Sequence, residues 1–314
     1  MTEKKIIAVV GATGGQGGGL ARAILDDSDG PFALRALTRD VSSARARELA
    51  DRGAEVVRAV AGDEASLRKA FDGAYGAFLV TNFWEHMSPD REKQEAAAMA
   101  RAADESGMAH VIWSTLEDTR EYIPVGSGRL PVLLDCYNVP HFDAKAEADR
   151  YFIDAQVPAT LLRTTFYWEN LLGPLAPQRG EDGRLVLALP MADSALSGIA
   201  VEDIGRTAYG IFGRGGDLTG RSVNIAGEHL TGTEMAERLT RVLGEEVVYA
   251  PVPWDVLRGS GQPGAVEMAN MFQFYAEVPE FAAARDLDLV RSLNPRLQSF
   301  ETWATEHKEA LTGA

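Results

Sequence analysis

The feature that most constrains the fold is a glycine-rich loop near the start of the chain. In "KIIAVVGATGGQGGGLARAIL", Gly11, Gly14 and Gly17 lie between a short apolar run and a segment with helical spacing. Gly11 would allow a tight turn, Gly14 would let the backbone approach a pyrophosphate, and Gly17 would let helix and strand pack closely. The free N–H groups of the helix start would then face the anion. The pattern predicts a strand–turn–helix unit that binds a dinucleotide, against the alternative of a glycine-rich turn without a ligand.

The rhythm of the first 165 residues supports this prediction. Apolar strand-like runs alternate with helix-like segments, which is typical of parallel βαβ units. The expected strands cover 5–10, 32–38, 54–60, 75–81, 109–115 and 159–165. From about residue 166 this alternation ends. We therefore predict an α/β fold with a doubly wound Rossmann-type parallel sheet in residues 1–165, and a smaller, mainly α domain in 166–314 for a substrate or partner. Some later segments are expected to return to the first domain.

Composition excludes several classes of function. The formal net charge is −15, from 31 Lys and Arg against 46 Asp and Glu, so direct nucleic-acid binding is not expected. A single cysteine and five scattered histidines predict neither disulfides nor a metal site. No run approaches the about 20 apolar residues of a membrane helix, and the N-terminus lacks a signal peptide. We expect a cytoplasmic protein, either monomer or homodimer, without a membrane association.

The end of the second expected strand bears on the choice between NAD and NADP. A carboxylate at this tip would bind the ribose 2′-hydroxyl, but here the strand ends in Leu37 and Thr38 and is followed by Arg39. A guanidinium can hold a 2′-phosphate through charge-assisted hydrogen bonds, whereas Asp40 would disfavour a phosphate if it pointed inward. We predict NADP(H) as the cofactor, with a solvated Arg39 as the alternative.

Six motifs in this order resemble the NmrA-like family of atypical short-chain dehydrogenases/reductases, and most of all its NADPH-sensing branch. They are "GATGGQGG" in the glycine loop, "TRD" at 38–40, "VTNFWE" at 80–85, "HFDAK" at 141–145, "FYWENLL" at 166–172 and "ANMFQFYA" at 269–276. The resemblance covers nearly the whole chain. The segment 117–138 departs from it, because it is about ten residues longer than in that branch, a large excess for a connecting loop.

The resemblance implies an NADP(H) site, and its residues carry over position by position. The expected contacts are Gly11, Thr13, Gly14, Gly15, Gln16 and Gly17 to the pyrophosphate, Arg39 and Ser43 near the 2′-phosphate, Asp63 near the adenine, Thr81, Asn82 and Phe83 along the ribose and pyrophosphate, Lys93 near the cofactor, Lys145 at the nicotinamide ribose, and Tyr167, Trp168, Glu169 and Asn170 at the nicotinamide pocket.

The catalytic residues of the wider group are only half present. Its working enzymes use a Tyr-x-x-x-Lys pair, and here His141 stands at the tyrosine position while Lys145 is kept. An imidazole can donate a proton near neutral pH, although a lysine one turn away would disfavour its acid form. His141 could equally sit at the start of the helix without any chemistry. Both residues are therefore candidates for catalysis.

Two functions remain open at this point. The first is an NADP(H)-binding sensor or regulator that responds to the redox state without turnover, which the missing tyrosine favours. The second is an NADPH-dependent reductase or isomerase that uses Lys145 on a small apolar carbonyl, enone or quinone.

Overall fold

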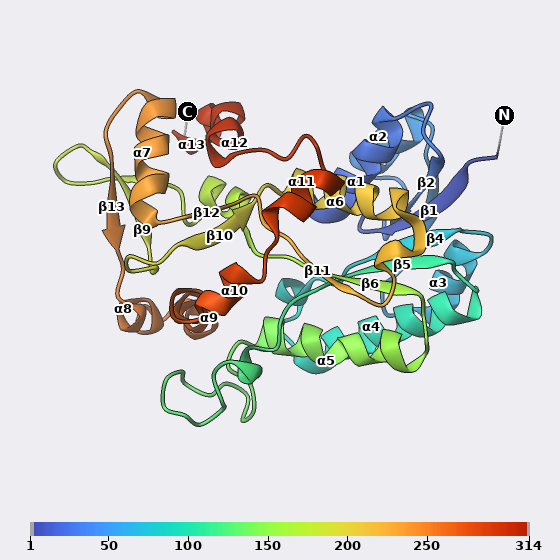
Figure 1. Cartoon of the computed structure of the whole chain (residues 1–314), viewed down its shortest axis with the longest axis horizontal. Helices are drawn as coiled ribbons and strands as arrows, with labels where there is room; N and C mark the ends of the chain where they lie inside the picture. The colour runs from blue at the N-terminus through green and yellow to red at the C-terminus, as the bar shows by residue number, and fades with distance from the viewer. Residues whose placement is uncertain (1–2, 313–314) are drawn as a thin grey trace.

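The computed structural model describes residues 3–312 and contains a seven-stranded parallel sheet covered by helices on both faces (Figure 1). The strand order is β11-β6-β5-β4-β1-β2-β3, and every neighbouring pair runs parallel. The strands are β1 (Lys5–Val10), β2 (Phe32–Thr38), β3 (Glu55–Arg58), β4 (Gly76–Leu79), β5 (His110–Thr115), β6 (Ala159–Arg163) and β11 (Ser222–Asn224). The predicted doubly wound Rossmann-type sheet is thereby confirmed, with β3 and β4 shorter at both ends than expected.

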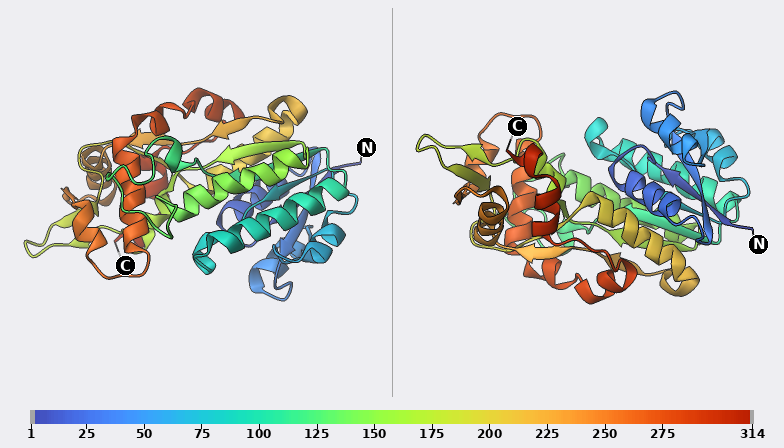
Figure 2. Two further views of the ribbon diagram at one scale, coloured as in Figure 1. Left: turned by 90° about the horizontal axis from the view of Figure 1, so that it is seen from below. Right: turned by 90° about the horizontal axis from the view of Figure 1, so that it is seen from above.

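The alternation of side chains along the strands explains the two helical layers. In β1, Ile7 and Val9 face one core cluster, and Ala8 faces the other. The first cluster packs on α1 (Gly15–Asp26), α2 (Ala44–Asp51), α6 (Val201–Gly213) and α11 (Leu287–Leu293). The second packs on α3 (Glu64–Phe71), α4 (Pro89–Glu105) and α5 (Pro140–Asp154). Figure 2 shows α4 and α5 side by side along their face of the sheet.

Later segments of the chain return to this sheet. β11 adds to the edge of β6, and α6 and α11 cover the face that α1 occupies. The chain thus crosses between the sheet and the C-terminal part several times. The expected domain boundary at residue 165 stays a prediction.

The remaining C-terminal residues form a second core from short helices and two small sheets. The sheets are β12-β10-β7 and β13-β9-β8, from β7 (Phe166–Tyr167), β8 (Gln178–Arg179), β9 (Leu185–Leu189), β10 (Leu196–Ile199), β12 (Glu228–Leu230) and β13 (Val247–Pro251). The helices are α7 (Gly232–Leu243), α8 (Trp254–Arg258), α9 (Ala265–Glu277), α10 (Pro279–Ala283), α12 (Phe300–Glu306) and α13 (Lys308–Leu311). Four 3₁₀ turns connect elements along the chain: η1 (Phe83–Glu85), η2 (Thr119–Glu121), η3 (Trp168–Leu172) and η4 (Gly215–Leu218).

Local signals in the sequence set the ends of these elements. Thr231 and Glu234 form a capping box at the start of α7, and Gly244, with φ of 80°, ends it in the left-handed conformation. Within residues 3–312, no helix combines the length and apolar character needed to cross a membrane.

Candidate functional site

A cleft of about 410 Å³ opens where β1, β2 and β4 end. In doubly wound sheets, ligands bind at this carboxyl edge. Ten of the predicted site residues line it: Gly11, Thr13, Gly14, Gly15, Gln16, Gly17, Arg39, Thr81, Asn82 and Tyr167. These ten residues therefore lie together at the carboxyl edge of the sheet. Their contacts with a cofactor stay predictions.

The glycine loop has the geometry of a pyrophosphate cradle. Gly11 has a φ of 67°, and its carbonyl accepts a hydrogen bond of 2.8 Å from the N–H of Gly14. A Cβ at Gly17 would lie 2.5 Å from the Gly11 oxygen, so only glycine fits there. No side chain caps α1 at Gly14, which leaves the first N–H groups of a twelve-residue helix free to face an anion.

Arg39 lies at the mouth of this cleft and is already paired. Its two terminal nitrogens lie 2.6 and 2.9 Å from the two carboxylate oxygens of Glu85, at the end of η1. This hydrogen bonding lowers the pKa of the Glu85 carboxyl and raises the pKa of Arg39. The carboxylate of Asp40 turns away and accepts hydrogen bonds from the N–H and hydroxyl of Ser42, which lower its pKa. The neighbouring acid therefore does not engage Arg39.

A second charged pair lines the same cleft from α4. Arg91 Nε lies 2.9 Å from Glu95 Oε1, one helical turn away. Glu85 and Glu95 together give the cleft two carboxylates in addition to two guanidinium groups.

A chain of hydrogen bonds crosses the inner end of the cleft. Ser114, near the end of β5, donates to the side-chain oxygen Oε1 of Gln16 at 2.7 Å. The side-chain Nε2 of Gln16 in turn donates to the Tyr167 hydroxyl at 2.7 Å. The Tyr167 hydroxyl also lies 3.2 Å from that of Thr164. Burial raises the pKa of Tyr167, so its phenol keeps its proton. These contacts fix the glycine loop relative to β5 and β7.

Lys145 lies behind the cleft wall in a buried ion pair. Its ammonium group is 2.6 Å from Glu92 Oε1 and 2.6 Å from Thr81 Oγ1, and it also contacts the Thr81 carbonyl at 3.3 Å. Glu92 is fully buried, and its other oxygen lies 3.5 Å from Nε2 of His86. Two of the three N–H donors of the ammonium are thus used by Thr81, and the Glu92 carboxylate balances its charge.

His141 is held by an acid from the C-terminal part of the chain. Its Nδ1 lies 2.6 Å from Oε1 of Glu267, in α9, and the same oxygen accepts the His141 backbone N–H at 2.8 Å. The ring lies against Trp84, with ring centroids 4.8 Å apart, and near Phe83. Nε2 has no hydrogen-bond partner among the described residues, and 8% of the side chain stays exposed. His141 is thus an oriented imidazole one turn before Lys145.

Several predicted contacts lie outside the cleft lining. Ser43 and Asp63 cap α2 and α3 by accepting hydrogen bonds from Ala46 and Ser66. Phe83, the first residue of η1, is only 2% exposed. Lys93 points from α4 towards α5, where it meets Glu147 and the hydroxyl of Tyr137.

The stretch after Tyr167 also points away from the cleft. Trp168 packs against Phe300 and Trp303 in the C-terminal core. The Glu169 carboxylate accepts the N–H of Val201 at the start of α6. Asn170 is exposed. The proposed cofactor roles of these residues stay predictions.

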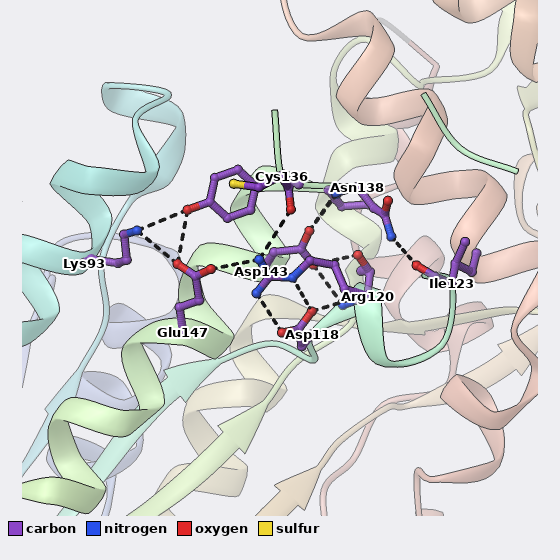
Figure 3. A network of polar contacts seen from close by, with 11 residues as sticks. Lys93, Asp118, Arg120, Ile123, Cys136, Asn138, Asp143 and Glu147 are labelled. Atoms are coloured by element: carbon purple, nitrogen blue, oxygen red, sulfur yellow. Dashed lines mark hydrogen bonds and ion pairs between the residues drawn. The ribbon is translucent and has the colours of Figure 1, made fainter. Parts of the chain in front are cut away.

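The long 117–138 segment is tied to α5 by polar contacts (Figure 3). The Asp143 carboxylate accepts four hydrogen bonds from the two ends of the segment, two from Thr119 and one each from the N–H groups of Asn138 and Val139. Arg120 bridges Asp118 and Glu147 at 2.7–2.8 Å. The segment is therefore fastened to α5 near both of its ends.

Comparison with known proteins agrees with this architecture. The sequence pattern of the NmrA-like family matches residues 3–304. The chain belongs to the NmrA-like family. A curated member, the NmrA-like family domain-containing oxidoreductase FrzB of Cladobotryum sp, is 28% identical over 291 residues, covering 86% of this chain and 83% of that protein. The oxidoreductase malD of Malbranchea aurantiaca is 27% identical over 265 residues, covering 79% and 76%.

Two solved structures share the fold over nearly the full length of the chain. The negative transcriptional regulator NmrA in complex with NADP has a TM-score of 0.81 and 22% identity, covering 100% of this chain and 99% of that one. The triphenylmethane reductase of Citrobacter sp complexed with NADP(H) has a TM-score of 0.75 and 19% identity, covering 98% and 99%.

Sequence reasoning missed four acids of this NmrA-like site. Glu85 ends the quoted "VTNFWE" motif, three residues after Asn82, and its position beyond a strand end was a usable signal. Glu95 follows Arg91 at the i,i+4 spacing of a helical ion pair. Glu92 and Glu267 gave no comparable signal, because their partners are distant in the sequence. Within residues 3–312, no group of three or more His, Cys, Asp or Glu side chains could hold a metal ion.

Proposed function

We propose that this NmrA-like protein binds NADP(H) in the cleft. The main observation behind this proposal is that two features meet in the cleft. The helix α1 follows the glycine loop without a side-chain cap, and Arg39 lies directly after β2. The free N–H groups of α1 would hold the pyrophosphate, and Arg39 would hold the 2′-phosphate. The NmrA complex with NADP supports this assignment by analogy of fold. The loop glycines line the cleft without side chains that would fill it, which supports the fit of a pyrophosphate there.

We further propose that binding serves to sense the NADPH/NADP state rather than to drive turnover. In the Tyr-x-x-x-Lys enzymes the lysine assists a tyrosine, but here that tyrosine is replaced by His141, and Lys145 donates two hydrogen bonds to Thr81 and forms an ion pair with buried Glu92. The resemblance in fold to NmrA, a negative transcriptional regulator, is consistent with a regulatory role. The output would be a contact with a protein partner in the cytoplasm.

A physical connection from the cleft to the surface supports this role. Thr81 lines the cleft and binds Lys145 on α5. Two residues before Lys145 on the same helix, Asp143 fastens both ends of the 117–138 segment. A shift at Thr81 on nucleotide binding would therefore reach this surface through a single helix.

The test is to titrate the purified protein with NADPH and NADP⁺ and to follow hydrogen exchange. We expect both nucleotides to bind and to protect the glycine loop, with a difference between them in the exchange of residues 117–138. Identical exchange patterns with the two nucleotides would contradict the sensor. Absence of binding would contradict the whole proposal.

The second candidate is an NADPH-dependent oxidoreductase of a small apolar carbonyl, enone or quinone. Two observations favour it: the curated relatives are named oxidoreductases, and His141 is oriented by Glu267 with Nε2 unengaged. NADPH would supply the reducing equivalents, and His141 could pass a proton to the substrate oxygen. The test is NADPH oxidation with a panel of such compounds. Turnover that is lost in both His141→Asn and Lys145→Met, in variants that a thermal melt shows to be folded at the assay temperature, would favour the enzyme over the pure sensor.

A further inference from the structure

The cleft contains an internal competitor for the group that Arg39 is proposed to bind. Both oxygens of Glu85 face the guanidinium, at 2.6 and 2.9 Å from its two terminal nitrogens. The side-chain amide of Asn82 also donates to Glu85, at 3.1 Å. This two-point geometry is the one in which a guanidinium holds a phosphate. Glu85 therefore occupies the position that a 2′-phosphate needs.

We propose that Glu85 sets the preference of this cleft between NAD(H) and NADP(H), by competing with the 2′-phosphate for Arg39. The inference rests on the proposed binding of a nicotinamide dinucleotide. It adds that the same cleft accepts NAD(H), with the Glu85 carboxylate as the acceptor for the ribose 2′-hydroxyl.

The two nucleotides make different demands on the Arg39–Glu85 pair. A 2′-hydroxyl is a neutral donor, so a carboxylate can accept its hydrogen bond while it stays paired with Arg39. In NAD-binding proteins an acid at the end of the second strand accepts this bond, whereas Glu85 would do so from the 3₁₀ turn after β4. A phosphate monoester carries a charge of about −1.5 to −2 at pH 7 and has only acceptors for this purpose. NADP(H) must therefore separate Glu85 from Arg39 and tolerate a nearby carboxylate, whereas NAD(H) need do neither.

The local structure around Glu85 holds its carboxylate beside Arg39. It ends the 3₁₀ turn that follows β4, and this turn is anchored by Phe83, which is 2% exposed. Glu85 itself keeps 40% of its side chain exposed, and Arg39 keeps 67%. The pair is thus accessible to a nucleotide and weak enough to be opened, since exposed ion pairs contribute little to stability.

The chain offers a matched control in Glu95. This acid lines the same cleft and contributes to the negative charge around Arg39, but its hydrogen-bonding partner is Arg91. Glu95→Gln removes one charge from the cleft without freeing Arg39. A comparison of the two glutamine variants therefore separates competition for Arg39 from a general effect of charge.

The experiment measures dissociation constants for NADPH, NADH, adenosine 2′,5′-bisphosphate and adenosine 5′-monophosphate by calorimetry. For Glu85→Gln, we expect binding of the two 2′-phosphorylated ligands to tighten about fivefold, and binding of the other two to stay equal or weaken, as expected when an exposed ion pair of this strength no longer competes. Glu95→Gln should change the ratio between the two ligand classes by less than half as much. Glu85→Ala, with a thermal melt for each variant, repeats the test without an amide.

The outcomes separate the two proposals. If wild-type protein binds none of the four ligands, the nucleotide-binding function fails and this inference with it. If the ligands bind but Glu85→Gln and Glu85→Ala leave the NADPH/NADH ratio unchanged, only the role of Glu85 is overturned. An equal shift in Glu95→Gln would also overturn it, because the effect would then be one of net charge. In the Arg39→Ala background, the gain from Glu85→Gln should shrink, and an undiminished gain would contradict the competition.

Discussion

The imidazole Nδ1 of His141 lies 2.6 Å from Oε1 of Glu267, 126 positions later in the chain. The same oxygen accepts the backbone N–H of His141 at 2.8 Å. One carboxylate therefore orients the ring that replaces the tyrosine of related enzymes and also joins α5 to α9. Both side chains are at least nine-tenths buried, so neither contact can be exchanged freely for water.

We predict that Glu267→Ala destabilises the fold more than Glu267→Gln. Alanine leaves the backbone N–H and Nδ1 of His141 without an acceptor, at a cost of about 2–3 kcal/mol, whereas glutamine keeps an acceptor oxygen and should lose about 1 kcal/mol. Equilibrium unfolding in guanidinium chloride measures both values. Equal losses in the two variants would contradict this assignment and reduce Glu267 to a packing residue.

The second prediction concerns the attachment of the 117–138 segment. Asp143→Asn replaces an oxygen that accepts from Asn138 and Val139 by an NH₂ group, which would face two N–H donors. We expect a loss of about 2–3 kcal/mol in the free energy of unfolding and faster tryptic cleavage after Arg129, whose side chain is 45% exposed.

The control for this experiment is Glu121→Gln. Glu121 belongs to the same segment, is exposed, and its side chain makes no hydrogen bond to any other described residue. Trypsin should cleave the Glu121→Gln variant at the wild-type rate. If Asp143→Asn also cleaves at that rate, the segment is held by its apolar contacts, and the four hydrogen bonds of Asp143 are not what orders it.

The fold was accessible from sequence because its signals are local. The loop around Gly11 and Gly17 combines a positive φ with a close backbone approach, and only glycine satisfies both within seven residues. Strand and helix periodicity are likewise readable within short windows. The same locality placed Arg39 at the cleft, because a residue directly after a β-strand must lie at the edge of the sheet.

The part of the site that the sequence did not predict depends on pairs of residues that lie far apart in the sequence. Glu92 and Lys145 are 53 positions apart in number, on neighbouring helices, and only the packing of α4 against α5 brings them to 2.6 Å. Helical phase also separates residues that are adjacent in sequence. Arg91 and Glu95 line the cleft, whereas Lys93 lies on the opposite side of α4 beside Glu147. A carry-over by motif position could not resolve that difference in direction.

The third prediction is a pH dependence of stability that depends on His110. This histidine at the start of β5 is fully buried, and burial lowers its pKa to about 4 from 6.5. The unfolded chain then binds more protons between these values, so the contribution of neutral His110 is present above about pH 6.5 and is lost as pH falls towards 4. The loss between pH 6.5 and pH 4 should be about 3 kcal/mol.

The measurement compares wild type with His110→Gln, which can still donate to Thr160 but does not titrate. Burial raises the pKa of Asp149 to about 6, so this acid stabilises the fold as pH falls from about 6 to 4, in the opposite sense. Because Asp149 is present in both proteins, its effect cancels in the difference. We expect the stability difference between the two proteins to be constant above pH 7 and to fall below pH 6.5. Parallel stability curves down to pH 4 would show that His110 does not carry this dependence.

The last prediction separates the structural part of Lys145 from any chemistry. Glu92 is fully buried and Lys145 is 9% exposed, so Lys145→Met should leave a buried carboxylate without its counter-charge. We expect this to lower the free energy of unfolding by about 3–5 kcal/mol. Glu92→Gln should also be costly, while the double variant should lose clearly less than the sum of the two, because the pair disappears together. The surface pair of Arg68 and Glu105, with side chains 47% and 45% exposed, provides the comparison, and Arg68→Met should cost far less than Lys145→Met. Strictly additive losses at Glu92 and Lys145 would mean that the two charges are solvated independently, and Lys145 would then be free to serve the nucleotide directly.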